Sequence, residues 1–405
     1  MSVESPLQTV PQHTPASRDS ITPAQRRRSL VFLSLAVGAV GFAMTLQLGL
    51  NANFVGQEMK LTGLQQGLLE TFRETCGITA LLVLAVLAGL PEPLIGAVML
   101  VLLGTGLSAY AFVRTYTWLV LASLVWSQGL HVWMPLPNSM ALALAEPNRS
   151  GRRLGQIAAA GSIGSAAGLA IAWLLTRAGA PIRPLWLLAG AAAIVGALCC
   201  VGVFRRIKAP GERLVFRRRY GLYYLLCFLE GWRKQIFLAF AGFMLVRRHG
   251  TPLSTMLALW MAIQVCGWLG APIVGRLIDR FGERPMLMVY YTAMTMVFVG
   301  YAAIDIPAVL YVLFVADSAF FVFAMALTTY VNRIAPSGEH TPTLSMGVAM
   351  NHVAAVLMPL IGGLLWELAG YRWAFVVGAL VAAASVGVAM LVPARAAPAD
   401  APAVG

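Results

Sequence analysis

The segment that decides the fold reads Gly275-Arg276-Leu277-Ile278-Asp279-Arg280-Phe281-Gly282-Glu283-Arg284, and it connects two long apolar runs, Ser254–Ile278 and Pro285–Ala303. A bilayer core of about 30 Å requires roughly 20 mostly apolar helical residues, and both runs are close to that length. Gly275 would allow close helix approach, Asp279 would lie at a helix end within reach of an arginine, and Gly282 would permit the turn. The segment therefore predicts a short polar connection between two membrane-spanning helices.

The same alternation of apolar runs and short polar breaks extends along the chain. Of its 405 residues, 59% are hydrophobic and 11% are charged, with a mean hydropathy of +0.77. Soluble proteins carry about a quarter charged residues, so this composition excludes a cytosolic enzyme, a disordered chain and a secreted disulfide scaffold. We predict an all-α integral membrane protein with twelve transmembrane helices, near Leu30–Ala52, Gly63–Leu90, Pro93–Val113, Tyr116–Leu144, Leu154–Leu175, Arg183–Val203, Tyr220–Val246, Ser254–Ile278, Pro285–Ala303, Pro307–Val331, Thr343–Glu367 and Tyr371–Leu391.

Basic residues indicate the orientation in the membrane. The net charge is +13, and with both termini placed in the cytoplasm the cytoplasmic segments hold 19 Lys and Arg residues against 7 on the opposite side. This bias follows the positive-inside rule and favours contact with anionic lipid head groups. Nucleic-acid binding is not expected, because the basic clusters lack interleaved aromatic residues outside the membrane. We expect a bacterial inner (plasma) membrane protein whose remaining cations, Arg73, Arg233 and Lys234, lie inside spans.

The predicted spans divide into two blocks of nearly equal length, which indicates a structural repeat. Two similar bundles can rock about a central site, a frequent plan among secondary transporters. The polar start lacks a signal-peptide cleavage site and is interpreted as a tail before an uncleaved first helix. The predicted organisation is a cytoplasmic N-terminal tail (1–28), a six-helix bundle (29–203), a basic cytoplasmic linker (204–219), a second six-helix bundle (220–392) and a cytoplasmic C-terminal tail (393–405).

The opening segment resembles the G-x-L-x-D-R-x-G-x-R signature of the major facilitator superfamily, and the twelve spans in two halves extend this resemblance over nearly the whole chain. The resemblance implies a cytoplasmic latch formed by Gly275, Asp279, Arg280, Gly282 and Arg284; the alternative is a basic loop that only satisfies the positive-inside rule. The corresponding first-half loop, 89–93, lacks the Asp-Arg pattern, and the glycines 161, 164 and 168 match the family's antiporter motif only loosely. Export is therefore not established.

Two predicted spans carry clusters of charges. Glu70, Arg73 and Glu74 share one helix face, and Glu230 precedes Arg233 and Lys234 by three and four residues. Charges within the membrane are costly and are functional candidates by default. We expect the acidic residues to exchange protons and the basic residues to bind an anionic solute or to act as counter-charges. The alternative is a static pair that holds helices together.

Other polar residues are predicted at similar depth. Asp317 is a lone carboxyl within a span, and we expect it to carry protons with Glu230, Glu70 and Glu74. The remaining members are each more readily explained by an interhelical hydrogen bond than by ligand binding, although His352 could titrate near neutrality. As substrate-binding candidates they join Arg233, Lys234 and Arg73, and they are Gln47, Gln128, His131, Gln264, Asn351 and His352.

Enzymatic chemistry is not expected. The five cysteines all lie in apolar spans, no phosphate-binding glycine loop occurs, and no histidine pair at i, i+4 suggests a metal site. We therefore predict no cofactor, no metal and no enzyme. The prediction is a monomeric secondary transporter that moves a small organic solute by alternating access with proton coupling, and the basic residues favour an anionic or zwitterionic solute. The alternative is a proton-driven efflux pump for drugs or toxic compounds.

Overall fold

A computed structural model describes residues 21–87, 89–146, 149–204, 207, 216–336 and 339–394. Within these residues the chain is all α-helical, without a strand, and its helices make the twelve passes expected from the sequence. Most of the predicted tails and most of the predicted linker lie outside the described residues.

The first six passes follow the predicted spans closely. The helix α1 begins seven residues earlier than expected, where Thr22 and Gln25 form a capping box around its first turn. Two prolines, Pro135 and Pro137, divide the fourth pass into two helices. The elements are α1 (Pro23–Asn53), the π-helix η2 (Phe54–Glu58), α2 (Gly63–Val86), α3 (Glu92–Ala109), α4 (Tyr116–Trp133), α5 (Leu136–Ala143), α6 (Ser150–Arg177) and α7 (Ile182–Val201).

The last six passes show the same pattern of continuous and interrupted helices. A π-helix interrupts the seventh pass, and a 3-10 turn interrupts the tenth. The elements are η3 (Arg218–Tyr220), α8 (Gly221–Ile236), η4 (Phe237–Ala241), α9 (Gly242–His249), α10 (Leu253–Phe281), α11 (Glu283–Ala303), α12 (Pro307–Phe321), η5 (Val322–Ala324), α13 (Met325–Ile334), α14 (His340–Ala369) and α15 (Tyr371–Met390).

Length and composition alone qualify ten helices among the described residues as membrane spans. The two remaining passes are α2 and the run from α8 to α9, which carry the two charge clusters noted above. Charged side chains inside a bilayer are tolerated where they face the interior of the helix bundle and find partners there. The structure must therefore supply partners for both clusters.

Corresponding positions of the two halves share contacts as well as helix breaks. The first residue of α3, Glu92, accepts a hydrogen bond of 2.6 Å from Ser139 on α5. The first residue of α11, Glu283, pairs at 3.0 Å with Arg333 on α13. A π-helix ends the first pass and another interrupts the seventh, so the two halves share these local features among the described residues.

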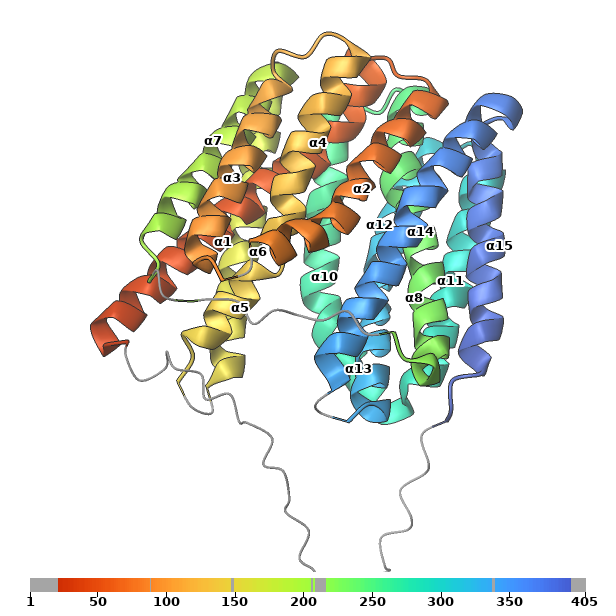
Figure 1. Cartoon of the computed structure of the whole chain (residues 1–405). Coiled ribbons are helices and arrows are strands. Elements are labelled where there is room, and N and C mark those ends of the chain that lie inside the picture. Colours follow the sequence, from red (N-terminus) through yellow and green to blue (C-terminus); the bar gives the residue numbers. More distant parts are fainter. Residues whose placement is uncertain are drawn as a thin grey trace, which may run out of the picture.

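The start of α1 and the end of α15 lie at the same end of the molecule (Figure 1). We call this the open end and the opposite one the closed end. At the closed end α2 packs directly on α14: a Cβ atom on Gly67 would lie 2.2 Å from the carbonyl oxygen of Pro359 and 2.9 Å from Cα of Gly363. Asn53 also crosses between the halves there, because its Nδ2 donates to the Thr251 carbonyl at 2.9 Å.

Near their midpoints α6 and α10 carry exposed apolar side chains. Ile163 on α6 is 70% exposed and Leu269 on α10 is 66% exposed. A Cβ atom built on Gly267 or Gly275 would meet no atom within 4 Å. The expected close helix approach at Gly275 is therefore wrong for this conformation, in which α10 lacks a packing partner at that position.

Candidate functional site

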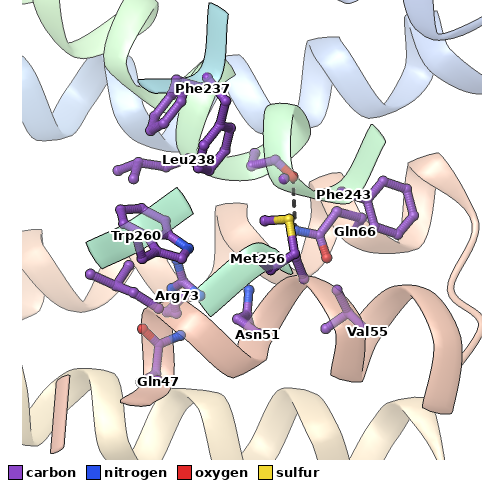
Figure 2. Close-up of a pocket in the computed structure, with 15 residues that line it drawn as sticks. Gln47, Asn51, Val55, Gln66, Arg73, Phe237, Leu238, Phe243, Met256 and Trp260 are labelled. Atoms are coloured by element: carbon purple, nitrogen blue, oxygen red, sulfur yellow. Dashed lines mark hydrogen bonds between the residues drawn. The ribbon is translucent and has the colours of Figure 1, made fainter. Parts of the chain in front are cut away.

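A small cavity of about 50 Å³ lies between the two halves, on the closed-end side, and we call it the central pocket. Figure 2 shows most of the side chains around it. It is lined by Gln47, Leu48, Asn51, Ala52, Val55, Gln66, Arg73, Phe237, Leu238, Ala239, Gly242, Phe243, Met256, Trp260 and Phe314.

The two halves of the chain supply different chemistry to the central pocket. Its polar side chains come from α1 and α2 and are Gln47, Asn51, Gln66 and Arg73. Its aromatic side chains come from η4, α9, α10 and α12 and are Phe237, Phe243, Trp260 and Phe314. Phe237 packs 4.9 Å from Phe314, ring centre to ring centre, and the Trp260 ring lies 5.5 Å from the same Phe314 ring. The pocket therefore has a polar wall and an aromatic wall.

Arg73 is the charged residue of the polar wall. Its guanidinium forms an ion pair with Glu70, one turn earlier on α2, and lies 5.1 Å from the ring centre of Trp126 on α4. Its Nη1 atom is buried and has no hydrogen-bond partner in the structure. Since a buried unpaired donor is costly, this atom offers a bond to a group that enters the pocket.

The π-helix η4 connects the two walls. A π turn shifts the backbone hydrogen-bond pattern, and such turns are frequent at functional sites. Here the Ala239 carbonyl accepts a bond of 3.0 Å from Gln66 Nε2, and the same nitrogen also donates to Glu70 Oε1 at 3.2 Å. Gln66 therefore links the Glu70–Arg73 pair to the opposite half of the chain.

The second charge cluster is buried in the C-terminal half, away from the residues of the central pocket. Arg233, with 1% of its surface exposed, donates to Glu230 at 2.8 Å and to Asp317 on α12 at 3.1 Å. Tyr290 on α11 donates to Glu230 at 2.8 Å. Asp317 Oδ2 is buried without a hydrogen-bond partner. We call Glu230, Arg233 and Asp317 the buried triad, and it holds two carboxyl groups for one cation.

The remaining charges of the two clusters meet at the seam between the halves. Lys234 Nζ donates to Asn351 Oδ1 on α14 at 2.8 Å. Glu74 Oε2 lies 3.4 Å from His352 Nδ1, also on α14. The His131 ring on α4 stands edge-on to the His352 ring, with centres 5.2 Å apart. These contacts bring together residues predicted separately as proton carriers and substrate ligands.

The other predicted site residues lie in different surroundings. Gln128 accepts a hydrogen bond of 2.6 Å from Thr79 on α2, and Gln264 is half-buried on α10 outside the central pocket lining. In the predicted latch Gly282 has φ +82, and its N–H donates to the Ile278 carbonyl at 2.8 Å, so it makes the predicted turn. Asp279 and Arg280 are exposed at the end of α10, and Arg284 is half-buried in the first turn of α11.

Ion pairs at the open end tie each half to itself. Arg153 lies 2.7 Å from Glu146 and lowers the pKa of that carboxyl to about 2. In the other half, hydrogen bonds from Tyr220 and Arg219 lower the pKa of Glu339. Both carboxylates are therefore ionised near neutral pH, and both pairs hold helix ends of one half together.

Sequence reasoning missed part of the site. Asn51 and Gln66 line the polar wall but were not selected, although Gln66 lies four residues before Glu70 and so on the same helix face. Tyr290 and the aromatic wall carry no local signal, because aromatic residues are common throughout apolar spans. The metal-type grouping of Glu74, His131 and His352 was also missed, since its members come from three helices and have no characteristic spacing.

Comparisons with known proteins show which families and solved structures this chain resembles. Residues 223–404 match the model of the Major Facilitator Superfamily. No curated protein matches the sequence. Among solved structures, the nucleoside transporter NupG aligns with a TM-score of 0.73 at 16% identity, covering 89% of this chain and 97% of that one. The D-xylose-proton symporter aligns with a TM-score of 0.68 at 14% identity, covering 90% of this chain and 98% of that one.

A third structure, a bacterial homolog of the human lysosomal transporter Spinster in an inward-facing and unoccupied conformation, aligns with a TM-score of 0.66 at 14% identity. It covers 92% of this chain and 97% of that one. At these identities the solved structures establish the fold alone, which all three share over their whole length. The C-terminal half of this membrane protein therefore matches the Major Facilitator Superfamily model, and the chain shares its fold with these three solved transporters.

Proposed function

We propose that the protein moves a small organic solute with an acidic or zwitterionic group and a ring or other flat apolar part, by proton-coupled alternating access. The observation that carries this proposal is the two-walled central pocket with the unpaired Nη1 atom of Arg73. An arginine offers planar, paired donors suited to a carboxylate, and a wall of aromatic side chains suits a ring. A hydrophobic drug would leave the polar wall unpaired, so the efflux alternative has less support.

The buried triad supports proton coupling. Two ionised carboxylates beside one buried arginine would leave an uncompensated negative charge, which is costly in a low-dielectric interior. Binding one proton removes that charge. We infer that the triad holds a proton in this conformation and that Asp317, with its unpaired Oδ2, is the carboxyl that receives it.

The pocket lies near the closed end, whereas toward the open end of α10 a Cβ atom built on Gly275 would meet no atom within 4 Å. If the positive-inside bias sets the orientation, the open end faces the cytoplasm of a bacterial cell. The described conformation then corresponds to an inward-facing state. The predicted latch belongs to this open end and would engage in the opposite state.

The pocket can be tested by ligand screening on purified protein. Thermal unfolding midpoints would be measured with panels of aromatic carboxylates, amino acids, nucleosides, sugars and neutral ring compounds. We expect stabilisation by compounds that combine an acidic group with a ring. For these compounds the Arg73→Gln variant should lose most of the shift, about a tenfold or larger loss of affinity, because a charged hydrogen bond is worth about 1.5–3 kcal/mol.

The matched control is Glu70→Gln. It removes the partner of Arg73 but keeps the arginine, so binding of the same compounds should persist or strengthen. Equal losses in both variants would mean that the ion pair serves only the structure of α2. Stabilisation of the wild type by neutral hydrophobic compounds alone would reject the proposed solute class.

A further inference from the structure

Three side chains of metal-binding type converge where α2, α4 and α14 meet. Glu74, His131 and His352 each place one possible ligand atom within 4.8 Å of the other two. Glu74 Oε2 and His352 Nδ1 are 3.4 Å apart. In a tetrahedral zinc site with bonds of about 2.0–2.1 Å, neighbouring ligand atoms lie about 3.3 Å apart. One edge of such a site is therefore already formed, and closing the others requires side-chain movements of about 1.5 Å or less.

The hydrogen bonding of His131 prepares that ring for a metal. Its Nδ1 lies 2.8 Å from the Ser127 carbonyl oxygen, which can only accept a hydrogen bond. In the neutral ring Nδ1 therefore carries the proton, and Nε2 keeps its lone pair. Metal-binding histidines commonly donate their second ring N–H to a backbone carbonyl or a carboxylate, which fixes the tautomer. Ser127 is itself held, because its hydroxyl donates to the Arg73 carbonyl at 2.9 Å.

A simple ion pair explains less of this arrangement. It accounts for Glu74 and His352, but it gives no role to the His131 ring that stands against His352. The His352 Nδ1 atom is buried and makes no hydrogen bond. Its bonding capacity is therefore available to a metal ion. Two imidazoles and one carboxylate form a ligand set that suits zinc and neighbouring transition metals and does not suit magnesium or calcium.

Two cationic side chains flank the cluster, and their positive charge weakens the binding of a divalent metal ion. Arg73 is paired with Glu70, and Lys234 donates to Asn351. Lys234 also lies close enough to interact electrostatically with Glu74. We therefore expect an affinity in the micromolar range, weaker than that of a structural zinc site.

We propose that a divalent transition metal ion of the zinc class binds Glu74, His131 and His352 and clamps the two halves together where α2, α4 and α14 meet. Glu74 and His131 belong to the N-terminal half, whereas His352 belongs to α14 of the C-terminal half. The complete ligand set therefore exists only while α2 and α14 are in contact. A ligand that binds one conformation better shifts the population toward it, so the ion would hold the described conformation and slow transport. This inference does not depend on which solute is carried.

The test uses the full chain, purified without an affinity tag, stripped with EDTA and titrated with ZnCl₂. We expect calorimetry to show one ion per chain and the thermal unfolding midpoint to rise with zinc concentration, while MgCl₂ has no effect. His131→Gln, His352→Gln and Glu74→Gln should each weaken zinc binding by about tenfold or more. The matched control is His249→Gln, which removes a histidine at the end of α9 and should leave zinc binding unchanged.

A charge variant and a conformational measurement complete the test. Lys234→Gln should strengthen zinc binding severalfold, because it removes a positive charge beside the site. A variant that only destabilised the protein would weaken zinc binding. Zinc should also slow hydrogen exchange in α2 around Glu74 and in α14 around His352 in the wild type, and not in His352→Gln. The proposal is overturned if zinc does not bind at one ion per chain, if His249→Gln loses binding as much as the cluster variants, or if bound zinc leaves exchange at the α2–α14 contact unchanged.

Discussion

At the scale of single residues, two arginines with similar sequence surroundings have different environments. Each follows a glutamate by three positions, and each forms an ion pair with it. Arg233 also bonds Asp317 and is enclosed by Tyr290 and Phe321 at 5.3 and 5.7 Å, so its donors are used inside one half. Arg73 retains an unpaired donor at the pocket. Both were predicted as substrate ligands, and in this conformation the pocket favours Arg73 for that role.

The buried triad gives the first residue-scale prediction. Asp317→Asn leaves a balanced Glu230–Arg233 pair, so the variant should remain folded with a thermal midpoint at least equal to that of the wild type. It should lose the proton dependence of transport, because the surplus carboxyl that must bind a proton is gone. The measurement is solute movement in proteoliposomes with and without a pH gradient. A variant that still responds to the gradient like the wild type would remove Asp317 from the coupling pathway.

The control for this prediction is Arg233→Gln. Removing the shared cation leaves two buried carboxyl groups without a counter-charge, and such losses cost about 3–5 kcal/mol. We expect a large fall of the thermal midpoint in Arg233→Gln and no fall in Asp317→Asn. The contrast separates the charge balance of the triad from damage to its packing.

At the scale of helices, the sequence predicted the passes well and their interruptions poorly. Apolar length is a local property, so all twelve spans could be located from composition and breaks. The π-helix η4 and the 3-10 turn η5 depend on contacts with neighbouring helices and leave no clear sequence signal. The central pocket could not be predicted from the sequence for the same reason. Gln66 and Ala239 are 173 residues apart, and only the packing of the two halves brings them together.

Helix packing gives an element-scale prediction in which two glycines act in opposite directions. Gly67 lies against Pro359 and Gly363, so Gly67→Val should force α2 and α14 apart and favour opening of the closed end. Gly275 faces open space in this conformation. If α10 packs closely in the opposite state, Gly275→Leu should be tolerated here and should hold the protein in the described conformation.

The measurement for both glycine variants is the modification rate of an engineered cysteine at Arg114, exposed between α3 and α4, and of another at Gly155, exposed near the start of α6. Gly67→Val should slow labelling at position 155 as the open end closes, whereas Gly275→Leu should keep it fast. Identical labelling in the two variants would show that these glycines do not control the conformation.

At the scale of the whole molecule, α1, α2 and α6 of the first half contact α10 and α14 of the second half. Salt bridges near the open end, Glu146–Arg153 and Glu339–Arg219, stay within one half each. Contacts that cross between the halves, such as Asn53–Thr251 and Gln66–Ala239, lie at the closed end or beside the central pocket. Opening the closed end would break few bonds inside either half, which is the requirement for rigid-body rocking.

Rocking of two rigid halves predicts opposite distance changes at the two ends. Spin labels on Gly155 and Ile273, exposed on the open-end halves of α6 and α10, report the open end. Labels on Arg114 and Glu367 report the closed end, after the five native cysteines are replaced by serine or alanine. A change of pH or a stabilising solute should shorten the first distance as the second lengthens. A third pair, Arg114 with Ile163, lies within one half and should stay constant. If that control distance changes as much as the other two, the halves deform and do not rock, and a pocket formed between them could not be offered to each side in turn.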